Sequence, residues 1–148
     1  MSAFTVQLEN RPGELSRLCA VMAARKVNIV LSAIAHGGRG TVAFVVDDEH
    51  EARTALQDAA IEFDERPALT VRMENMPGAG AATFRRLAEA GVNLDLLLPV
   101  QVSKGEFFAV VCVDDMPAAR TALRDQLVGE EDGSSSKSPS GPASPHAT

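Results

Sequence analysis

The sequence predicts an α+β protein made of two small, similar modules that pack together. Residues 3–9 alternate between apolar and polar side chains and are rich in β-formers, which is typical of a strand. Apolar residues then recur at helical spacing, at Leu15, Leu18, Cys19 and Met22. The same order of strand, turn and helix returns farther along the chain, and the two copies fill most of its 148 residues.

The repeat extends almost to residue 128. Adding 65 to a residue number aligns identical residues in the first half of each copy: Thr5 with Thr70, Glu9 with Glu74, Asn10 with Asn75, Pro12 with Pro77, Gly13 with Gly78, Val27 with Val92 and Asn28 with Asn93. Farther on, residues 52–56 match residues 119–123, so two residues have been inserted between. A stacked solenoid needs about three or more repeats, so two copies predict a pair of duplicated modules at residues 1–66 and 67–128.

The loop between the first strand and the first helix carries the strongest motif of the repeat. Pro12 presets φ where no N–H is needed, and Gly13 leaves the start of the helix without a side chain. The Asn10 side chain is able to accept a hydrogen bond from the first free amides. Free N–H groups at a helix N-terminus suit a carboxylate or a phosphate. The same residues also fit a plain, well-capped helix, which is the commoner case.

The other elements follow from periodicity and turn residues. The first module is expected to continue with a helix at 13–26, a hairpin at 30–35 and 41–47, a helix after Asp48 and a strand at 61–65. The second is expected to have a strand at 68–74, a helix at 78–90, a hairpin at 94–102 and 106–114, and a helix at 116–127. The pairs Asp47-Asp48 and Asp114-Asp115 are interpreted as helix caps, and Pro99 indicates a bulge or an edge strand. A fourth strand of the second module is not evident: either that sheet is one strand short, or residues 61–75 serve both sheets.

These residues resemble the ACT domain. The resemblance rests on the Asn-Arg-Pro-Gly-x-Leu turn at residues 10–15 and the Val-Asn-Ile segment at 27–29, each between the expected strands and helices. It covers nearly all of residues 3–127, in tandem. It implies a ferredoxin-like βαββαβ fold for each module, with helices on one face of an antiparallel sheet. In outline the chain is most similar to stand-alone tandem ACT proteins, and its first loop also resembles regulatory domains of phosphoglycerate dehydrogenase and the acetolactate synthase regulatory subunit.

The resemblance implies a site for a small amino acid at the junction of the modules. Loop amides would hold the ligand carboxylate and an Asn would orient it, with Asn93 opposite the Asn10 loop and Asn28 opposite the Asn75 loop. The ligand-binding residues it implies are Asn10, Arg11, Pro12, Gly13, Glu14, Leu15, Asn28, Asn75, Pro77, Gly78 and Asn93. The first loop is favoured, because Gly80 stands in place of Leu15 in the second, although a glycine could also admit a bulkier ligand. Leu8 and Met73 replace a His of serine-sensing relatives, which favours a less polar ligand.

Composition and spacing favour a binding protein over an enzyme. His36, His50 and His146 have neither metal-ligand spacing nor a nucleophile partner, so no catalytic residue, metal or cofactor is expected. The segment 78–83 lacks the third glycine of a dinucleotide-binding turn. Cys19 and Cys112 are expected to be buried thiols.

Charge and hydropathy limit the partners. The formal net charge of −6, without a basic stripe, argues against nucleic acid, and the short apolar runs and absent signal features argue against a membrane, so a cytoplasmic protein is expected. Residues 129–148 are acidic and then rich in Ser, Pro and Gly, which predicts a disordered tail. The partners expected are a small amino acid, a biosynthetic enzyme such as acetolactate synthase, and a second copy of the chain, because a ferredoxin-like sheet leaves a free edge.

Overall fold

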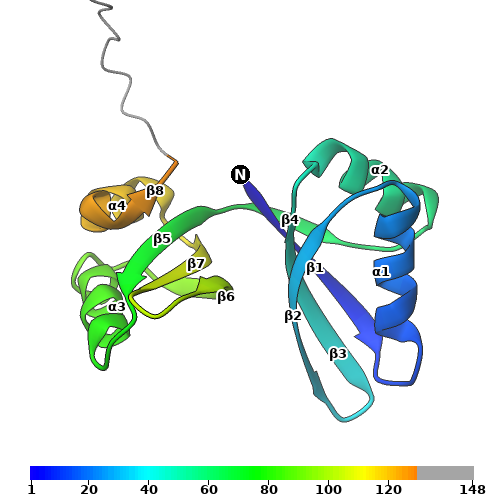
Figure 1. Cartoon of the computed structure of the whole chain (residues 1–148), viewed down its shortest axis with the longest axis horizontal. Helices are drawn as coiled ribbons and strands as arrows, with labels where there is room; N and C mark the ends of the chain where they lie inside the picture. The colour runs from blue at the N-terminus through cyan, green and yellow to red at the C-terminus, as the bar shows by residue number, and fades with distance from the viewer. Residues whose placement is uncertain (130–148) are drawn as a thin grey trace, which may run out of the picture.

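The chain forms two four-stranded antiparallel sheets, each with two helices beside it (Figure 1). This is a computed structural model, and it describes residues 1–129. The first module contains β1 (Ser2–Glu9), α1 (Glu14–Ala24), β2 (Ile29–His36), β3 (Arg39–Val46), α2 (Glu49–Asp58) and β4 (Asp64–Pro67). The second contains β5 (Leu69–Glu74), α3 (Ala79–Glu89), β6 (Leu94–Val102), β7 (Glu106–Val113), α4 (Met116–Ala122), the 3-10 turn η1 (Arg124–Gln126) and β8 (Leu127–Val128). The predicted disordered tail lies outside the described residues, apart from Gly129.

The strand orders are β2-β3-β1-β4 and β6-β7-β5-β8, so each module has the predicted βαββαβ arrangement. The predicted α+β fold with two similar modules is confirmed. The irregularity expected at Pro99 is also present, because β6 is an edge strand whose register with β7 shifts between Pro99 and Gln101.

The second module has a fourth strand where the sequence suggested a helix. The helix expected at 116–127 ends at Ala122, and β8 pairs with β5 through Thr70–Val128 and Val71–Leu127. This pairing gives hydrogen-bond partners to backbone groups on the free edge of β5, which local helical spacing cannot reveal. The second sheet is therefore not one strand short. Residues 61–75 do serve both sheets, with β4 in the first and β5 in the second, but the fourth strand of the second sheet is β8.

The strand β4 begins three residues later than predicted, because Ile61 belongs to the turn that closes α2 and does not start β4. Ala60 adopts a left-handed conformation with φ 54°, and the Ile61 amide donates to the Leu56 carbonyl over 2.9 Å. Such an end satisfies the last helical carbonyls and turns the following apolar side chain back onto the helix. Ile61 is accordingly buried in the first core.

Each module has a core between its helices and its sheet. In the first, Phe4 and Phe44 are fully buried and stack with ring centroids 5.4 Å apart. Leu18 and Met22 of α1 are buried as predicted, whereas Cys19 is only half-buried and Leu15 is 39% exposed. The helix therefore turns Leu15 away from the core.

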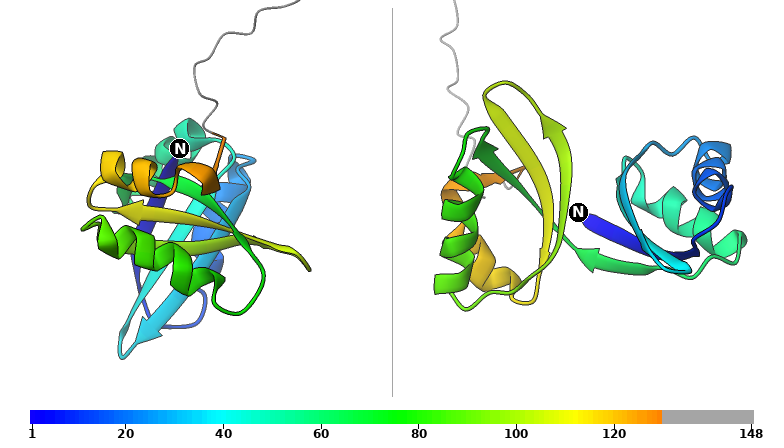
Figure 2. Two further views of the ribbon diagram at one scale, coloured as in Figure 1. Left: turned by 90° about the vertical axis from the view of Figure 1, so that its left-hand side faces the viewer. Right: turned by 90° about the horizontal axis from the view of Figure 1, so that it is seen from below.

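A third apolar cluster joins the two modules. The sheets face one another and the helices lie on the outside (Figure 2). The sheet faces turned away from the helices bring together Ala3, Val45, Ala68, Leu98, Val110 and Cys112. Burial raises the pKa of the Cys112 thiol, in keeping with the expected structural role of that residue. The Arg66 guanidinium, on β4, also donates to Asp95 on β6 over 2.6 Å. Packing between the modules thus extends each small core.

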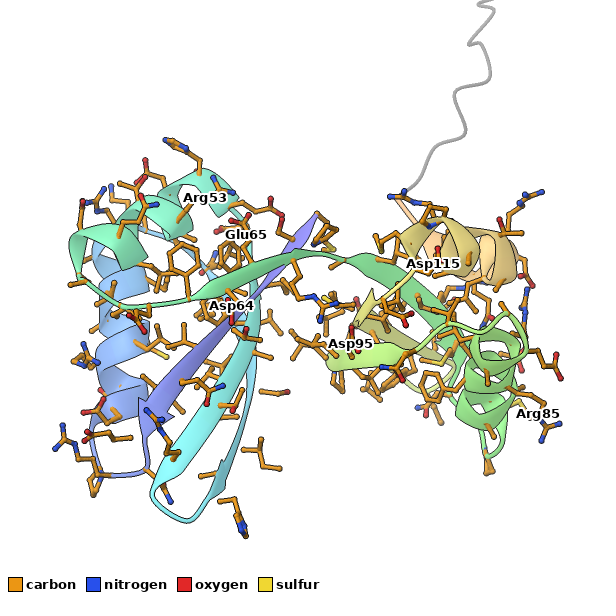
Figure 3. All side chains as sticks on the ribbon, turned by 180° about the vertical axis from the view of Figure 1, so that it is seen from behind. Arg53, Asp64, Glu65, Arg85, Asp95 and Asp115 are labelled. Carbon is orange, nitrogen blue, oxygen red and sulfur yellow. The ribbon has the colours of Figure 1, made fainter. Side chains whose placement is uncertain are left out.

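A bidentate ion pair links β4 to α2 and makes the stability of the fold depend on pH. Arg53 Nε and a terminal nitrogen donate to the two carboxylate oxygens of Glu65 over 2.8 and 2.5 Å (Figure 3). These hydrogen bonds lower the pKa of Glu65. A carboxyl whose pKa is lower in the folded state contributes stability above its unfolded pKa, and this is lost as pH falls through the folded value.

We expect Glu65→Gln to lower the melting temperature at neutral pH by roughly 2–4 °C. The difference from the parent protein should shrink as the pH is lowered below 4.5, the ordinary pKa of a glutamate. Thermal unfolding followed by circular dichroism across this range measures it, with Glu89→Gln on the exposed side of α3 as the control. A difference that is independent of pH would contradict the assignment.

Candidate functional site

Both strand–helix loops enter their helix through a glycine in a left-handed conformation. Gly13 has φ 91° and ψ −17°, and Gly78 has φ 91° and ψ −16°. A side chain is strained at such angles, so the repeated glycine is required by the backbone. Neither helix has a side-chain cap at this position. The first amides of α1 and α3 are therefore not capped by the loop asparagines.

The loop asparagines instead hold the β-hairpin of their own module. Asn10 donates from its backbone amide to the Gly38 carbonyl over 3.0 Å and from Nδ2 to the Gly37 carbonyl over 2.9 Å. Asn75 repeats this arrangement, with its amide 3.2 Å from the Gly105 carbonyl and its side chain donating to the Ser103 carbonyl. The prediction that Asn10 caps the helix is wrong, because its side chain acts as a donor to the hairpin.

A cavity of about 210 Å³ lies beside the first loop. Four of the predicted site residues line it: Asn10, Arg11, Glu14 and Leu15. Pro12 and Gly13 belong to the same loop and are exposed, but they do not line the cavity. The opposite wall comes from β2 and β3 and includes Ala33, Ile34, Gly40 and Thr41. The structure therefore adds a hairpin wall that sequence reasoning missed.

Ile34 is the most exposed apolar side chain of this wall, with 75% of its surface accessible. Alternation along β2 places it on the sheet face away from the helices, but alternation gives no sign of a cavity. Ile34 borders the cavity because Asn10 holds the hairpin tip next to the loop. That link joins residues 27 positions apart in the sequence, which no local motif could show.

Charges of both signs surround the cavity. Arg11 Nε lies 3.2 Å from Glu14 Oε1, a terminal nitrogen of Arg11 lies 3.1 Å from Glu9, and Arg17 lies 3.4 Å from Glu14. The hydrogen bond from Arg11 is the main cause that lowers the pKa of Glu14. Arginine and carboxylate groups on one rim match the two charges of an amino acid.

Asn28 and Asn93 bind the ends of their own hairpins. Asn28 donates from its amide and its side chain to Asp47, over 2.9 and 3.2 Å. The Asn93 amide donates to Asp114 over 2.8 Å, and its side chain donates to Asp95 over 2.7 Å. Asp47 and Asp114 are thus not helix caps.

The neighbouring aspartates are helix caps, as predicted. Asp48 accepts from the Glu51 amide and Asp115 from the Ala118 amide, each over 3.0 Å. The two aspartates of each pair therefore have different roles.

The structure does not bring Asn93 to the Asn10 loop within one chain. Asn93 bonds to Asp95, Asp95 pairs with Arg66, and Arg66 lies opposite Ala3 near the beginning of β1. Asn10 follows the other end of β1, about 20 Å away at roughly 3.3 Å per residue. Figure 3 shows Asp95 on the side of the second module that faces the first.

Asn28 and the Asn75 loop are separated in the same way. Asn28 precedes β2 and bonds to Asp47, which follows Val46 at the end of β3 near the start of β1. Asn75 instead follows Glu74, at the end of β5 that lies away from the link between the modules. Neither of the expected pairs of loop and asparagine therefore meets within one chain.

Within residues 1–129, no group of three or more His, Cys, Asp or Glu side chains is placed to hold a metal ion. Among the same residues, none of the helices is both long enough and apolar enough to cross a membrane. The groups that border the cavity at the first loop are loop amides, an arginine, carboxylates and apolar side chains.

No protein-family model matches the sequence, and no curated protein matches it. Solved structures do match over both modules. A protein from Bacteroides thetaiotaomicron aligns with TM-score 0.77 and 21% identity, over 86% of this chain and 90% of that one. The ligand-free regulatory subunit of aspartate kinase from Thermus thermophilus aligns with TM-score 0.65 and 22% identity, over 83% and 87%. The corresponding subunit from Thermus flavus gives TM-score 0.61 and 21% identity, over 84% and 90%.

The chain has a tandem ACT fold. The resemblance seen in the sequence is confirmed at the level of the fold. In this ACT pair the first strand–helix loop borders a cavity, and the asparagines after the first helices lie at the other end of each module.

Proposed function

We propose that this tandem ACT protein is a non-catalytic regulator that binds a small amino acid at its first strand–helix loop. The observation that carries the proposal is the cavity of about 210 Å³ between that loop and the β2–β3 hairpin. It lies next to a helix N-terminus without a side-chain cap, where free amides favour a carboxylate. Its rim offers charges of both signs, and its wall is largely apolar.

Each part of an amino acid has a counterpart at this cavity. The carboxylate faces the first amides of α1 and the Arg11 guanidinium. The ammonium group faces Glu9, Glu14 and the Oδ1 atom of Asn10, whose Nδ2 is already bonded to Gly37. A side chain of modest polarity packs on Leu15, which is 39% exposed, and on Ala33 and Ala35 of β2.

We place the functional site in the first module. The second loop has the same backbone conformation at Gly78, with Asn75 and Pro77 in matching positions, but Gly80 replaces the apolar wall that Leu15 provides. Asn28 and Asn93 are left out of the proposed site because they lie at the other end of each module.

Two substitutions in the first turn of α1 test this site. Leu15→Asp replaces the apolar wall for the ligand side chain with a carboxylate that also repels the nearby ligand carboxylate, whereas Ser16→Asp adds the same charge one residue on, outside the cavity. A negative charge interacts favourably with the dipole at a helix N-terminus, so neither substitution is expected to destabilise the fold. The twenty amino acids are first screened by thermal shift, and the strongest is titrated by calorimetry.

We expect Leu15→Asp to weaken binding at least about tenfold, which corresponds to about 1.4 kcal/mol, and Ser16→Asp to change it by less than about twofold. The absence of any thermal shift or heat with all twenty amino acids would contradict the proposed function. Equal effects of the two substitutions would show that the ligand binds elsewhere.

A regulatory subunit that binds an enzyme in trans is the second candidate. It is supported by the similarity to the regulatory subunit of aspartate kinase over both modules, and acetolactate synthase was the enzyme that the loop resemblance suggested. Affinity purification from the native host separates the candidates, because a subunit of this kind should co-purify with a biosynthetic enzyme in stoichiometric amounts. The homodimer and the cytoplasmic location stay predictions.

A further inference from the structure

The first sheet has an open edge on the side of β4. Strand β1 pairs with β3 over six residues, from Phe4 to Glu9, but β4 pairs only with Ser2 to Thr5. Beyond Thr5 this edge borders a cavity of about 690 Å³ between β1, α1 and the segment 60–64. Figure 3 shows Asp64 beside β1, where the two strands separate. A volume of this size lies within the range of small-ligand sites.

In the second module, a side chain of the protein closes the equivalent edge. Gln126 Nε2 donates to the Arg72 carbonyl over 3.3 Å and to Thr83 Oγ1 over 2.9 Å. Arg72 corresponds to Gln7, and both have the same register, Arg72 opposite Phe108 and Gln7 opposite Thr41. The Gln7 carbonyl therefore points to the same edge, which the cavity borders. The carboxamide of Gln126 is the group that satisfies this edge in the second module.

The first module has a carboxylate where the second has this carboxamide. Thr5 lies opposite Asp64 and Thr70 opposite Val128, so Glu62 and Gln126 each stand two residues before the matching paired position. A carboxylate cannot donate a hydrogen bond to the Gln7 carbonyl. Within residues 1–129 no side chain donates to the Gln7 carbonyl, which is therefore left to water or to a ligand.

Charged side chains line the open edge without pairing to one another. Arg39, Glu62 and Asp64 border the cavity, and within residues 1–129 none of them takes part in an ion pair or a side-chain hydrogen bond. Arg17 lies on the same rim and has only a 3.4 Å contact with Glu14. Elsewhere in the described residues most arginines have carboxylate partners, as Arg53, Arg66 and Arg86 do. Unpaired charges of both signs thus lie beside the Gln7 carbonyl, which has no side-chain hydrogen-bond donor among the described residues. This combination suits an amino-acid zwitterion whose side chain carries a hydrogen-bond donor.

We propose that this open edge is a second binding site, distinct from the cavity at the first loop, for an amino acid with a carboxamide side chain. The ligand carboxamide takes the place that Gln126 takes in the second module and donates to the Gln7 carbonyl. The ligand carboxylate pairs with Arg39 and Arg17, and its ammonium group pairs with Glu62 and Asp64. L-glutamate lacks the donor and adds a charge next to Glu62, so the site discriminates against it.

The test follows backbone amide chemical shifts of the full chain during titration with L-glutamine, L-asparagine and L-glutamate. We expect L-glutamine or L-asparagine to shift the amides of Gln7, Glu62 and Phe63, and to bind at least about tenfold more tightly than L-glutamate. Leu15→Asp should leave these shifts intact, because it alters only the cavity at the first loop. This variant separates failure of the open-edge site from failure of the proposed function.

Three substitutions assign the shifts to the open edge. Arg39→Gln should weaken L-glutamine binding at least about tenfold, and Arg85→Gln, an exposed arginine of α3, should change it by less than about twofold. Glu62→Gln gives the first module its own carboxamide and should abolish the L-glutamine response while the fold persists. The proposal is overturned if Gln7 does not respond to millimolar L-glutamine, if L-glutamate binds equally well, or if Arg39→Gln behaves like Arg85→Gln.

Discussion

Replacing Phe44 by Ala is expected to lower the free energy of unfolding by about 3–5 kcal/mol, because a fully buried ring is lost and a cavity is left. Phe44 stacks on Phe4, whose ring lies 5.9 Å from the ring of Phe63, so truncating Phe44 removes one side of the packing around Phe4. A module of about 60 residues buries only about 60% of its unfolded surface, which leaves little stability in reserve.

Urea unfolding followed by circular dichroism measures this loss. Phe44→Leu serves as the control, since it keeps most of the apolar volume and should be clearly milder than Phe44→Ala. A loss below about 1 kcal/mol for Phe44→Ala would contradict the assignment of this ring to a tightly packed core.

Replacing Leu98 by Ala should destabilise the contact between the modules by about 2–5 kcal/mol. Leu98 is fully buried in the cluster that joins the two sheets, whereas the adjacent Leu97 is 40% exposed. Leu97→Ala removes the same atoms from the same strand, so it is a matched control, and its cost should be about 1 kcal/mol or less.

Hydrogen exchange with mass spectrometry shows which strands lose stability. With Leu98→Ala, exchange should rise in β1 and β3 as well as in β6 and β7, because the cluster contains residues of both sheets. Equal destabilisation by the two substitutions, or an effect confined to the second module, would contradict cooperative packing of the modules.

The sequence predicted the fold because the signals that define it are local and repeated. The strand alternation, the helical spacing and the Pro-Gly loop occur twice in register, and each copy specifies the same strand–helix turn. The errors lie where contacts between distant residues decide the structure. Ile61 was expected to start a strand, but its amide binds the Leu56 carbonyl and its side chain is buried with Leu56, so it belongs to the turn that closes α2. Leu127 has helical spacing from Leu123, but it pairs with Val71 on the free edge of β5 and forms part of β8.

The candidate site was predicted in part for the same reason. The loop residues Asn10, Arg11, Glu14 and Leu15 are contiguous, so one motif finds them all. The wall formed by Ile34 and Thr41 depends on the hydrogen bond from Asn10 to the hairpin, and no local pattern encodes that contact. The expected role of Asn93 depended on how the modules are placed, which the repeat alone does not determine.

Amide chemical shifts of the isotopically labelled chain test most directly whether an amino acid binds at the first strand–helix loop. With the amino acid that gives the strongest thermal shift, the amides of Gly13, Glu14, Leu15 and Ile34 should move together along one saturable curve, and that of Asn93 should not move. Shifts confined to Asn28 and Asn93, or no shift at the first loop at saturating ligand, would contradict the proposed site.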